Sequence, residues 1–153
     1  MTSYPILFGF KDLIAGNGFF AGVTGNGRAL LVDEGDGFWM YGVNPGGIAA
    51  GGGNAAEAQF EFRLAYKSVL FDIAAEAAGF DEFTVQVERF FRETNEPTAA
   101  EWEEAVAEVR QGRVNADWLT KRKAESRIGV DIVLLEQAVP SVNSLEDQAD
   151  LAA

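Results

Sequence analysis

The sequence contains no cysteine and no histidine among its 153 residues. The absence of cysteine excludes disulfide bonds, thiolate nucleophiles and zinc–thiolate sites. The absence of histidine removes the commonest metal ligand and the usual side-chain base near neutral pH. We therefore expect no catalytic residue, no metal site and no cofactor, and hence a protein that is not an enzyme.

Basic residues and long hydrophobic runs are also scarce. The chain has 12 lysines and arginines against 24 acidic residues, for a formal net charge of −12, which argues against direct binding to nucleic acid or anionic lipid. No stretch approaches the roughly 20 apolar residues that a membrane-spanning helix needs. The N-terminal segment lacks the basic start of a signal peptide, and Lys11 and Asp12 interrupt its apolar run. We expect a cytoplasmic protein with no membrane partner.

The first third of the chain has the pattern of short strands joined by tight turns. Fourteen of the 17 glycines lie in residues 1–53. Aromatic and β-branched residues, which strands prefer, are concentrated between regularly spaced turn signals at Asn17-Gly18, Gly25-Asn26-Gly27 and Gly35-Asp36-Gly37. This pattern predicts an antiparallel β-meander with strands over 19–23, 28–33 and 38–43.

A long helix is predicted after this region. Asn54 and Glu57 have the spacing of a helix cap and its N3 partner, and Gly79 suits the left-handed residue just past a helix end. One face has apolar residues at helical spacing: Ala58, Phe62, Tyr66, Val69, Ile73 and Ala77. A second stripe comprises Phe60, Leu64, Phe71 and Ala78. Because both faces need cover, we expect the sheet on one and later helices or another subunit on the other, and hence a homo-oligomer.

The remaining chain is predicted to be mainly helical before a last strand. Residues 81–94 show a helical pattern, and Thr98 with Glu101 forms a second capping box. The next helix should bury Trp102, Ala105, Val106 and Val109. The sequence further predicts a short helix over 116–125, a buried strand over 128–138 and a flexible acidic tail over 139–153. The expected fold is a single α+β domain over 1–138, an antiparallel β-meander packed against a long helix, with a helical insertion over 80–127 before the last strand.

Residues 28–78 carry a specific series of elements. An alternating strand, Trp39 to Val43, leads to Pro45 and a turn at Gly47; residues 48–50 would be a third strand. Gly51 to Gly53, Asn54 and then Glu57-Ala58 follow at the start of the long helix. In this series the segment resembles the HicB-like antitoxin domain. The resemblance implies a partial RNase H-like β-β-β-α-β fold and a role in a toxin–antitoxin system, in which the protein neutralises a small basic ribonuclease.

The charges after residue 92 are segregated. Residues 93–108 contain six acids and no base, whereas residues 110–127 contain six bases and two acids. Either these are solvated faces that pair with each other, or the acidic helix is a surface for a basic protein. On the second reading, the partner-binding residues are Glu96, Glu101, Trp102, Glu103, Glu104 and Glu108. The basic segment Lys121-Arg122-Lys123 is too small to indicate nucleic-acid binding at this net charge.

The leading hypothesis is thus a non-enzymatic protein-binding module resembling a HicB-like antitoxin. An alternative from a different class is an acidic phage-type inhibitor that mimics the charge of nucleic acid and blocks a nuclease or defence complex. A third reading is a metal-dependent nuclease, in which Asp33, Glu34, Asp36 and Asp131 converge on a cation. The same Asp33–Gly37 segment is also an ordinary hairpin turn.

Overall fold

The computed structural model describes residues 1–135 and 147–153, which form an α+β fold with three helices and a mixed sheet of seven strands. The strands are β1 (Thr2–Gly16), β2 (Phe19–Asp33), β3 (Phe38–Asn44), β4 (Ala49–Gly52), β5 (Lys121–Arg122), β6 (Gly129–Leu134) and β7 (Gln148–Ala152). The helices are α1 (Ala55–Glu76), α2 (Phe80–Arg92) and α3 (Glu96–Arg110). In these described parts of the chain, none of the helices is long and apolar enough to cross a membrane.

The long hairpin of β1 and β2 is the centre of the sheet. The strands lie in the order β4-β3-β2-β1-β7-β5, and β6 also pairs with β2. β3 pairs with residues 28–33 of β2, and β6 pairs with residues 21–26 of the same strand. The two strands therefore follow one another along one edge of β2. All pairs are antiparallel except β5 with β7. An antiparallel meander packed against a long helix is therefore present, but the predicted strands 19–23 and 28–33 are both parts of β2, and β1 is added before it.

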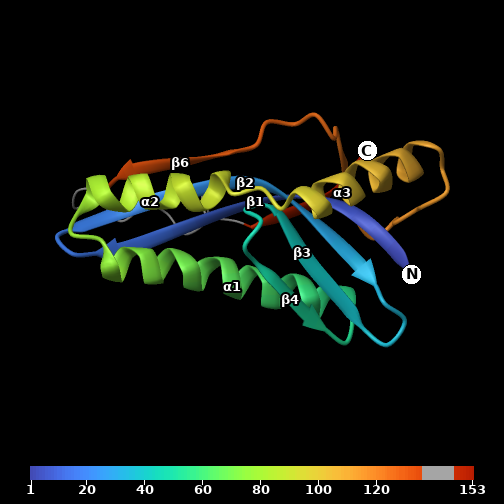
Figure 1. Cartoon of the computed structure of the whole chain (residues 1–153), viewed down its shortest axis with the longest axis horizontal. Helices are drawn as coiled ribbons and strands as arrows, with labels where there is room; N and C mark the ends of the chain where they lie inside the picture. Colours follow the sequence, from blue (N-terminus) through green and yellow to red (C-terminus); the bar gives the residue numbers. More distant parts are fainter. Residues whose placement is uncertain (136–146) are drawn as a thin grey trace.

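Helices cover both faces of the sheet. Alternate residues of β1 point to opposite faces, as strand geometry requires. Phe8 and its neighbours pack against Tyr66 of α1 and Phe83 of α2, whereas Leu7 packs with Trp102 of α3. Figure 1 shows α1 and α2 lying along the hairpin and α3 at the end of the molecule where both chain termini are found.

The predicted turn at Gly25-Asn26-Gly27 is wrong, because β2 continues through it without interruption. Only Gly18, Gly35 and Gly112 have positive φ within the part of the chain that the structure describes. Gly25 and Gly27 instead allow other residues to pack closely against the backbone of β2. A Cβ on Gly25 would collide with the hydroxyl of Tyr66, and a Cβ on Gly27 would collide with the carbonyl oxygen of Asn44 and the ring of Phe8.

The helix ends are partly as predicted. The side chain of Asn54 accepts a hydrogen bond from the backbone N–H of Glu57 at 2.8 Å, which confirms the cap of α1. Gly79 has an extended backbone and is the N-cap of α2, so the predicted left-handed terminus is wrong. The cap of α3 is Asn95, whose side chain accepts from the N–H of Thr98 at 3.3 Å. Thr98 itself lies inside the helix, because the helix already begins at Glu96.

The two faces of α1 differ sharply in their environment. The buried stripe is Ala58, Phe62, Tyr66, Leu70 and Ala74, whereas Val69 and Ile73 are only partly buried. The buried stripe is therefore rotated slightly around the helix relative to the predicted one, toward Leu70 and Ala74. The second stripe is exposed at Phe60, Leu64 and Phe71. The later helices do not cover it, since α2 lies beside α1 on the sheet and α3 lies on the opposite face.

The C-terminal third needs three corrections. Residues 116–125 form turns and the short strand β5, not a helix. β6 occupies part of the predicted strand 128–138, but as an exposed edge strand and not a buried one. Residues 148–152 of the expected flexible tail form β7 between β1 and β5, with Leu151 and Ala152 fully buried, while residues 136–146 lie outside the described residues. β7 forms because Ala149 and Leu151 are apolar residues at alternate positions, which become partly or fully buried when the strand pairs with the free edge of β1.

Candidate protein-binding site

α3 presents one buried face and one acidic face. Trp102, Ala105, Val106 and Val109 are buried, as predicted from their helical spacing. The acids between them therefore point away from the sheet. Glu96, Glu101, Glu103 and Glu104 are exposed and Glu108 is half-buried.

Trp102 is the predicted partner-binding residue that the structure excludes. Its side chain is 1% exposed, packs among Leu7, Leu30 and Val106, and donates a hydrogen bond from Nε1 to the carbonyl oxygen of Ile6 at 3.3 Å. A side chain so placed cannot contact a partner without unfolding the helix from the sheet. Trp102 is a core residue, and the helical pattern that predicts its burial outweighs its position among the acids.

An acidic groove runs beside α3, and we define it by Glu34, Glu101, Glu104 and Glu108. Two hollows of about 320 and 250 Å³ make up the groove, and both are lined by Met1, Ser3 and Glu101. Glu104 and Glu108 line the first hollow, whereas Glu34 lines the second together with Tyr41. The groove therefore joins carboxylates from α3 and from the turn after β2.

Tyr41 shows the effect of this negative charge. Its hydroxyl donates a hydrogen bond to Oε2 of Glu34 at 2.9 Å. Burial, this hydrogen bond and the charges of Glu34 and Glu101 all raise the pKa of Tyr41 above its ordinary value. The ring of Tyr41 also stacks with the exposed Trp39, with centroids 6.1 Å apart. An aromatic pair thus borders one end of the acidic groove.

Few cations neutralise the groove. Glu108 pairs with Arg113, with Oε1 and Nη1 3.1 Å apart. Among residues 1–135 and 147–153, Glu96, Glu101 and Glu104 form no ion pair. The prediction that the acidic and basic segments pair with each other therefore holds for Glu108 and not for these three residues.

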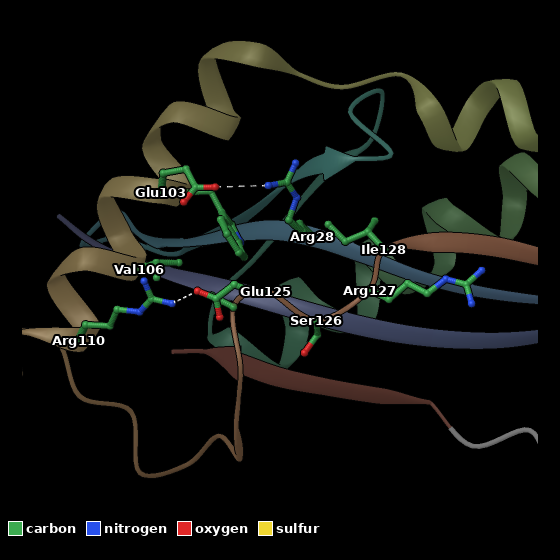
Figure 2. A pocket seen from close by; sticks show the side chains of 10 residues that line it. Arg28, Glu103, Val106, Arg110, Glu125, Ser126, Arg127 and Ile128 are labelled. Atoms are coloured by element: carbon green, nitrogen blue, oxygen red, sulfur yellow. Dashed lines mark hydrogen bonds and ion pairs between the residues drawn. The ribbon is translucent and has the colours of Figure 1, made fainter.

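A second cavity of about 430 Å³ lies on the other side of α3, between the helix and residues 124–128 (Figure 2). Here Arg28 donates from Nε and Nη2 to Oδ1 of Asn44 at 3.0 and 2.6 Å, and its guanidinium lies 5.1 Å from the ring centroid of Trp102. Figure 2 shows Glu103 pointing toward Arg28, at 3.6 Å from Nη1.

Four of the five charged residues that line this cavity are paired with each other. Arg110 pairs with Glu125, and the hydrogen bond between them lowers the pKa of Glu125. Arg127 points away from the cavity in Figure 2. An ion that entered beside these two pairs would have to displace a partner already present. The acidic groove is for this reason the better candidate site.

The basic segment has a structural role. Arg122 approaches Asp150 of β7 at 3.5 Å, and β5 pairs with β7. Lys121 and Lys123 remain exposed. One of the three charges in this segment therefore stabilises the C-terminal strand, and the segment is not a continuous basic surface.

The candidate nuclease residues are not brought together. Asp131 lies opposite Thr24 in the sheet, whereas Asp33 is nine positions further along β2, or about 30 Å away. Asp33 accepts a hydrogen bond from the N–H of Gly35 at 3.0 Å, as expected for the hairpin turn.

Sequence reasoning missed Arg28 and Tyr41. Arg28 is one of only two basic residues in residues 1–53, and this scarcity was the available signal. In comparisons with known proteins, no family model, no curated protein and no solved structure matches the chain.

Proposed function

We propose that the chain is a non-enzymatic protein-binding module, resembling a HicB-like antitoxin, that neutralises a small basic ribonuclease in the cytoplasm. The acidic groove supports this proposal because Glu101 and Glu104 are exposed and form no ion pair among the described residues. A ribonuclease surface that binds RNA is basic, and complementary charge increases the rate of association. The neighbouring Trp39 and Tyr41 would supply apolar contact area at the edge of the interface.

The resemblance extends the proposal to the fold. The partial RNase H-like unit would comprise residues 28–33 of β2, then β3, β4 and α1, with β6 as its last strand after the helical insertion. These elements follow one another in this order along the chain, with α2, α3 and β5 between α1 and β6. The chain adds β1 before this unit, and β6 pairs antiparallel with the first half of β2.

The test is co-purification of the tagged full chain from its native host. The expected result is a small basic ribonuclease in fixed ratio. A variant with Glu101→Gln and Glu104→Gln should bind that protein at least about tenfold more weakly, the equivalent of about 1.4 kcal/mol. The matched control is Asp81→Asn with Glu88→Gln, which removes the same charge from exposed positions on α2. Equal loss in both variants, or recovery of the chain alone, would contradict the proposal.

The acidic phage-type inhibitor remains the alternative. Glu101, Glu104 and Glu108 follow one another along α3 at intervals of about 4.5 and 6 Å, a row of charges that could imitate a nucleic-acid backbone. Under this alternative, a subunit of a nuclease or defence complex would co-purify in place of the small ribonuclease. Added double-stranded DNA would then compete with the chain for that subunit.

A further inference from the structure

The outer face of α1 combines exposed apolar side chains with a hollow beside them. Phe60, Leu64 and Phe71 are 60%, 45% and 43% exposed. Their spacing of four and seven residues puts them on one side of the helix. We call these three residues the outer stripe. Exposed large apolar side chains scattered singly are ordinary, whereas a row of three along one helix is typical of a surface that binds another helix.

The hollow has a volume of about 370 Å³ and lies between α1 and the strands β1 and β7. Its apolar lining comes from Phe10, Ala56, Phe60 and Ala149. Phe60 belongs both to this hollow and to the outer stripe. A large apolar side chain that entered the hollow would therefore contact the start of the stripe at the same time.

The charges around the outer stripe are mostly negative. Glu57, Glu61, Asp72 and Glu76 are exposed on α1. Two basic residues lie on the same helix, but Arg63 is already engaged by Asp12 and Asp147, both at 2.7 Å. Lys67 is exposed, with Nζ 6.0 Å from the ring centroid of Phe71. The last turn of α1 has no basic residue to offset the negative end of its helix dipole.

This charge distribution decides between two partners for the outer stripe, and it argues against the homo-oligomer expected from the sequence. A second copy of the chain would bring its own acidic α1 against this one, and each copy has a net charge of −12. A helix of another protein, with lysines or arginines beside its apolar face, would instead meet opposite charges on both ends of α1.

We propose that the outer face of α1 is a docking site for a cationic amphipathic helix of a partner protein. The apolar face of that helix lies along Phe60, Leu64 and Phe71, and one of its large side chains fills the hollow beside Phe60. The surface lies across the sheet from the acidic groove, so the inference goes beyond the proposed function and does not depend on it.

The probe for the test is a synthetic helical peptide with leucines along one face and lysines on both flanks. A second peptide, with glutamate in place of every lysine, controls for apolar contact alone. The full chain is titrated with each peptide by fluorescence anisotropy, and its own mass in solution is measured by analytical ultracentrifugation. We expect the cationic peptide to bind, the anionic peptide to bind at least tenfold more weakly, and the chain to be monomeric at the concentrations of the titration.

Single substitutions test where on the surface the cationic peptide binds. Phe60→Gln should weaken binding of the cationic peptide at least tenfold, whereas Val85→Gln, at an equally exposed position on α2, should leave it unchanged. Circular dichroism verifies that both variants fold. The inference is overturned if both peptides bind equally, if Val85→Gln weakens binding as much as Phe60→Gln, or if the chain dimerises and Phe60→Gln abolishes the dimer. The last outcome would identify a second copy as the occupant. Loss of binding in the Glu101→Gln, Glu104→Gln variant would place the peptide in the acidic groove instead.

Discussion

Replacing Arg63 with methionine should be among the most damaging single changes to the stability of this protein. Arg63 donates from Nη1 and Nη2 to the two carboxylate oxygens of Asp12 at 3.0 and 2.7 Å. Asp12 points into the core and is only 3% exposed. Methionine preserves much of the packing of the side chain over Phe10, where the guanidinium now lies 4.5 Å from the ring centroid. The variant therefore leaves a buried carboxylate without its partner.

The expected magnitude follows from the burial of Asp12. Removing one member of a buried ion pair costs about 3–5 kcal/mol. In a chain of this size, that corresponds to a melting temperature lower by about 6–20 °C. Asp147 also accepts from Arg63, at 2.7 Å, but its side chain is about half exposed. Asp147→Asn should therefore cost no more than about 1 kcal/mol.

Thermal and urea denaturation followed by circular dichroism measure these differences. The double variant Asp12→Leu with Arg63→Met should recover most of the lost stability, because it leaves no unpaired charge in the core. If Arg63→Met costs no more than Asp147→Asn, or if the double variant loses the sum of the two single effects, then Asp12 is not a buried member of this pair.

Three further predictions concern the core and the close approach of backbones. Gly27→Ala should destabilise the fold by about 1–3 kcal/mol in urea denaturation, because the added methyl group would collide with backbone atoms. Gly79→Ala places its methyl group in open space and should change stability by less than about 1 kcal/mol. Trp102→Ala should cost about 3–5 kcal/mol in the same assay, since the residue is fully buried, whereas Trp118→Ala, which loses an edge contact at an exposed site, should cost about 1 kcal/mol. Burial, then the charge of Asp12, raises the pKa of Tyr66 above its ordinary value of 10.0, so the contribution of Tyr66 to stability should be constant well below pH 10 and should fall above it, because the unfolded chain releases this proton before the folded chain does. Tyr66→Phe should reduce that alkaline loss in denaturation curves taken at successive pH values, and equal loss in the variant would refute the assignment.

Features that depend on neighbouring residues were predictable from the sequence. The cap at Asn54 and the burial of Trp102, Val106 and Val109 follow from spacing within one helix. The α+β class follows from the change in glycine content after residue 53, but the strand boundaries do not, since the predicted strands 19–23 and 28–33 are one strand, β2. In these places the chemistry of a few adjacent residues determines the local structure.

Features that depend on distant parts of the chain were not predictable in the same way. Gly25 and Gly27 resemble turn glycines, but their role is to admit Tyr66, Phe8 and the backbone of Asn44. The spacing of Thr98 and Glu101 matches a capping box and predicts a cap at Thr98, whereas the structure uses the equally suitable Asn95. In each case the sequence contains two locally acceptable solutions, and tertiary packing selects between them.

The candidate site also combines features that neighbouring residues predict with features that depend on distant parts of the chain. The exposed acids of α3 could be predicted from charge and periodicity. Their assembly with Glu34 into one groove could not, since it depends on how α3 packs against the turn after β2. The same is true of Arg28, which lies on β2 between β1 and β3 and pairs with Glu103 of α3, the helix that covers this face of the sheet.

The pairing of β1 with β7 has a consequence for how the chain is made. Ile6 lies opposite Leu151, so the strand that covers this edge is synthesised 145 residues after the strand it covers. At about 5–20 residues per second, the edge stays open on the ribosome for roughly 7–30 seconds. During that time Ile6 to Phe8 form an apolar strand edge of the kind that pairs with other chains. Synthesis rate and early contact with chaperones should therefore affect the yield of folded protein.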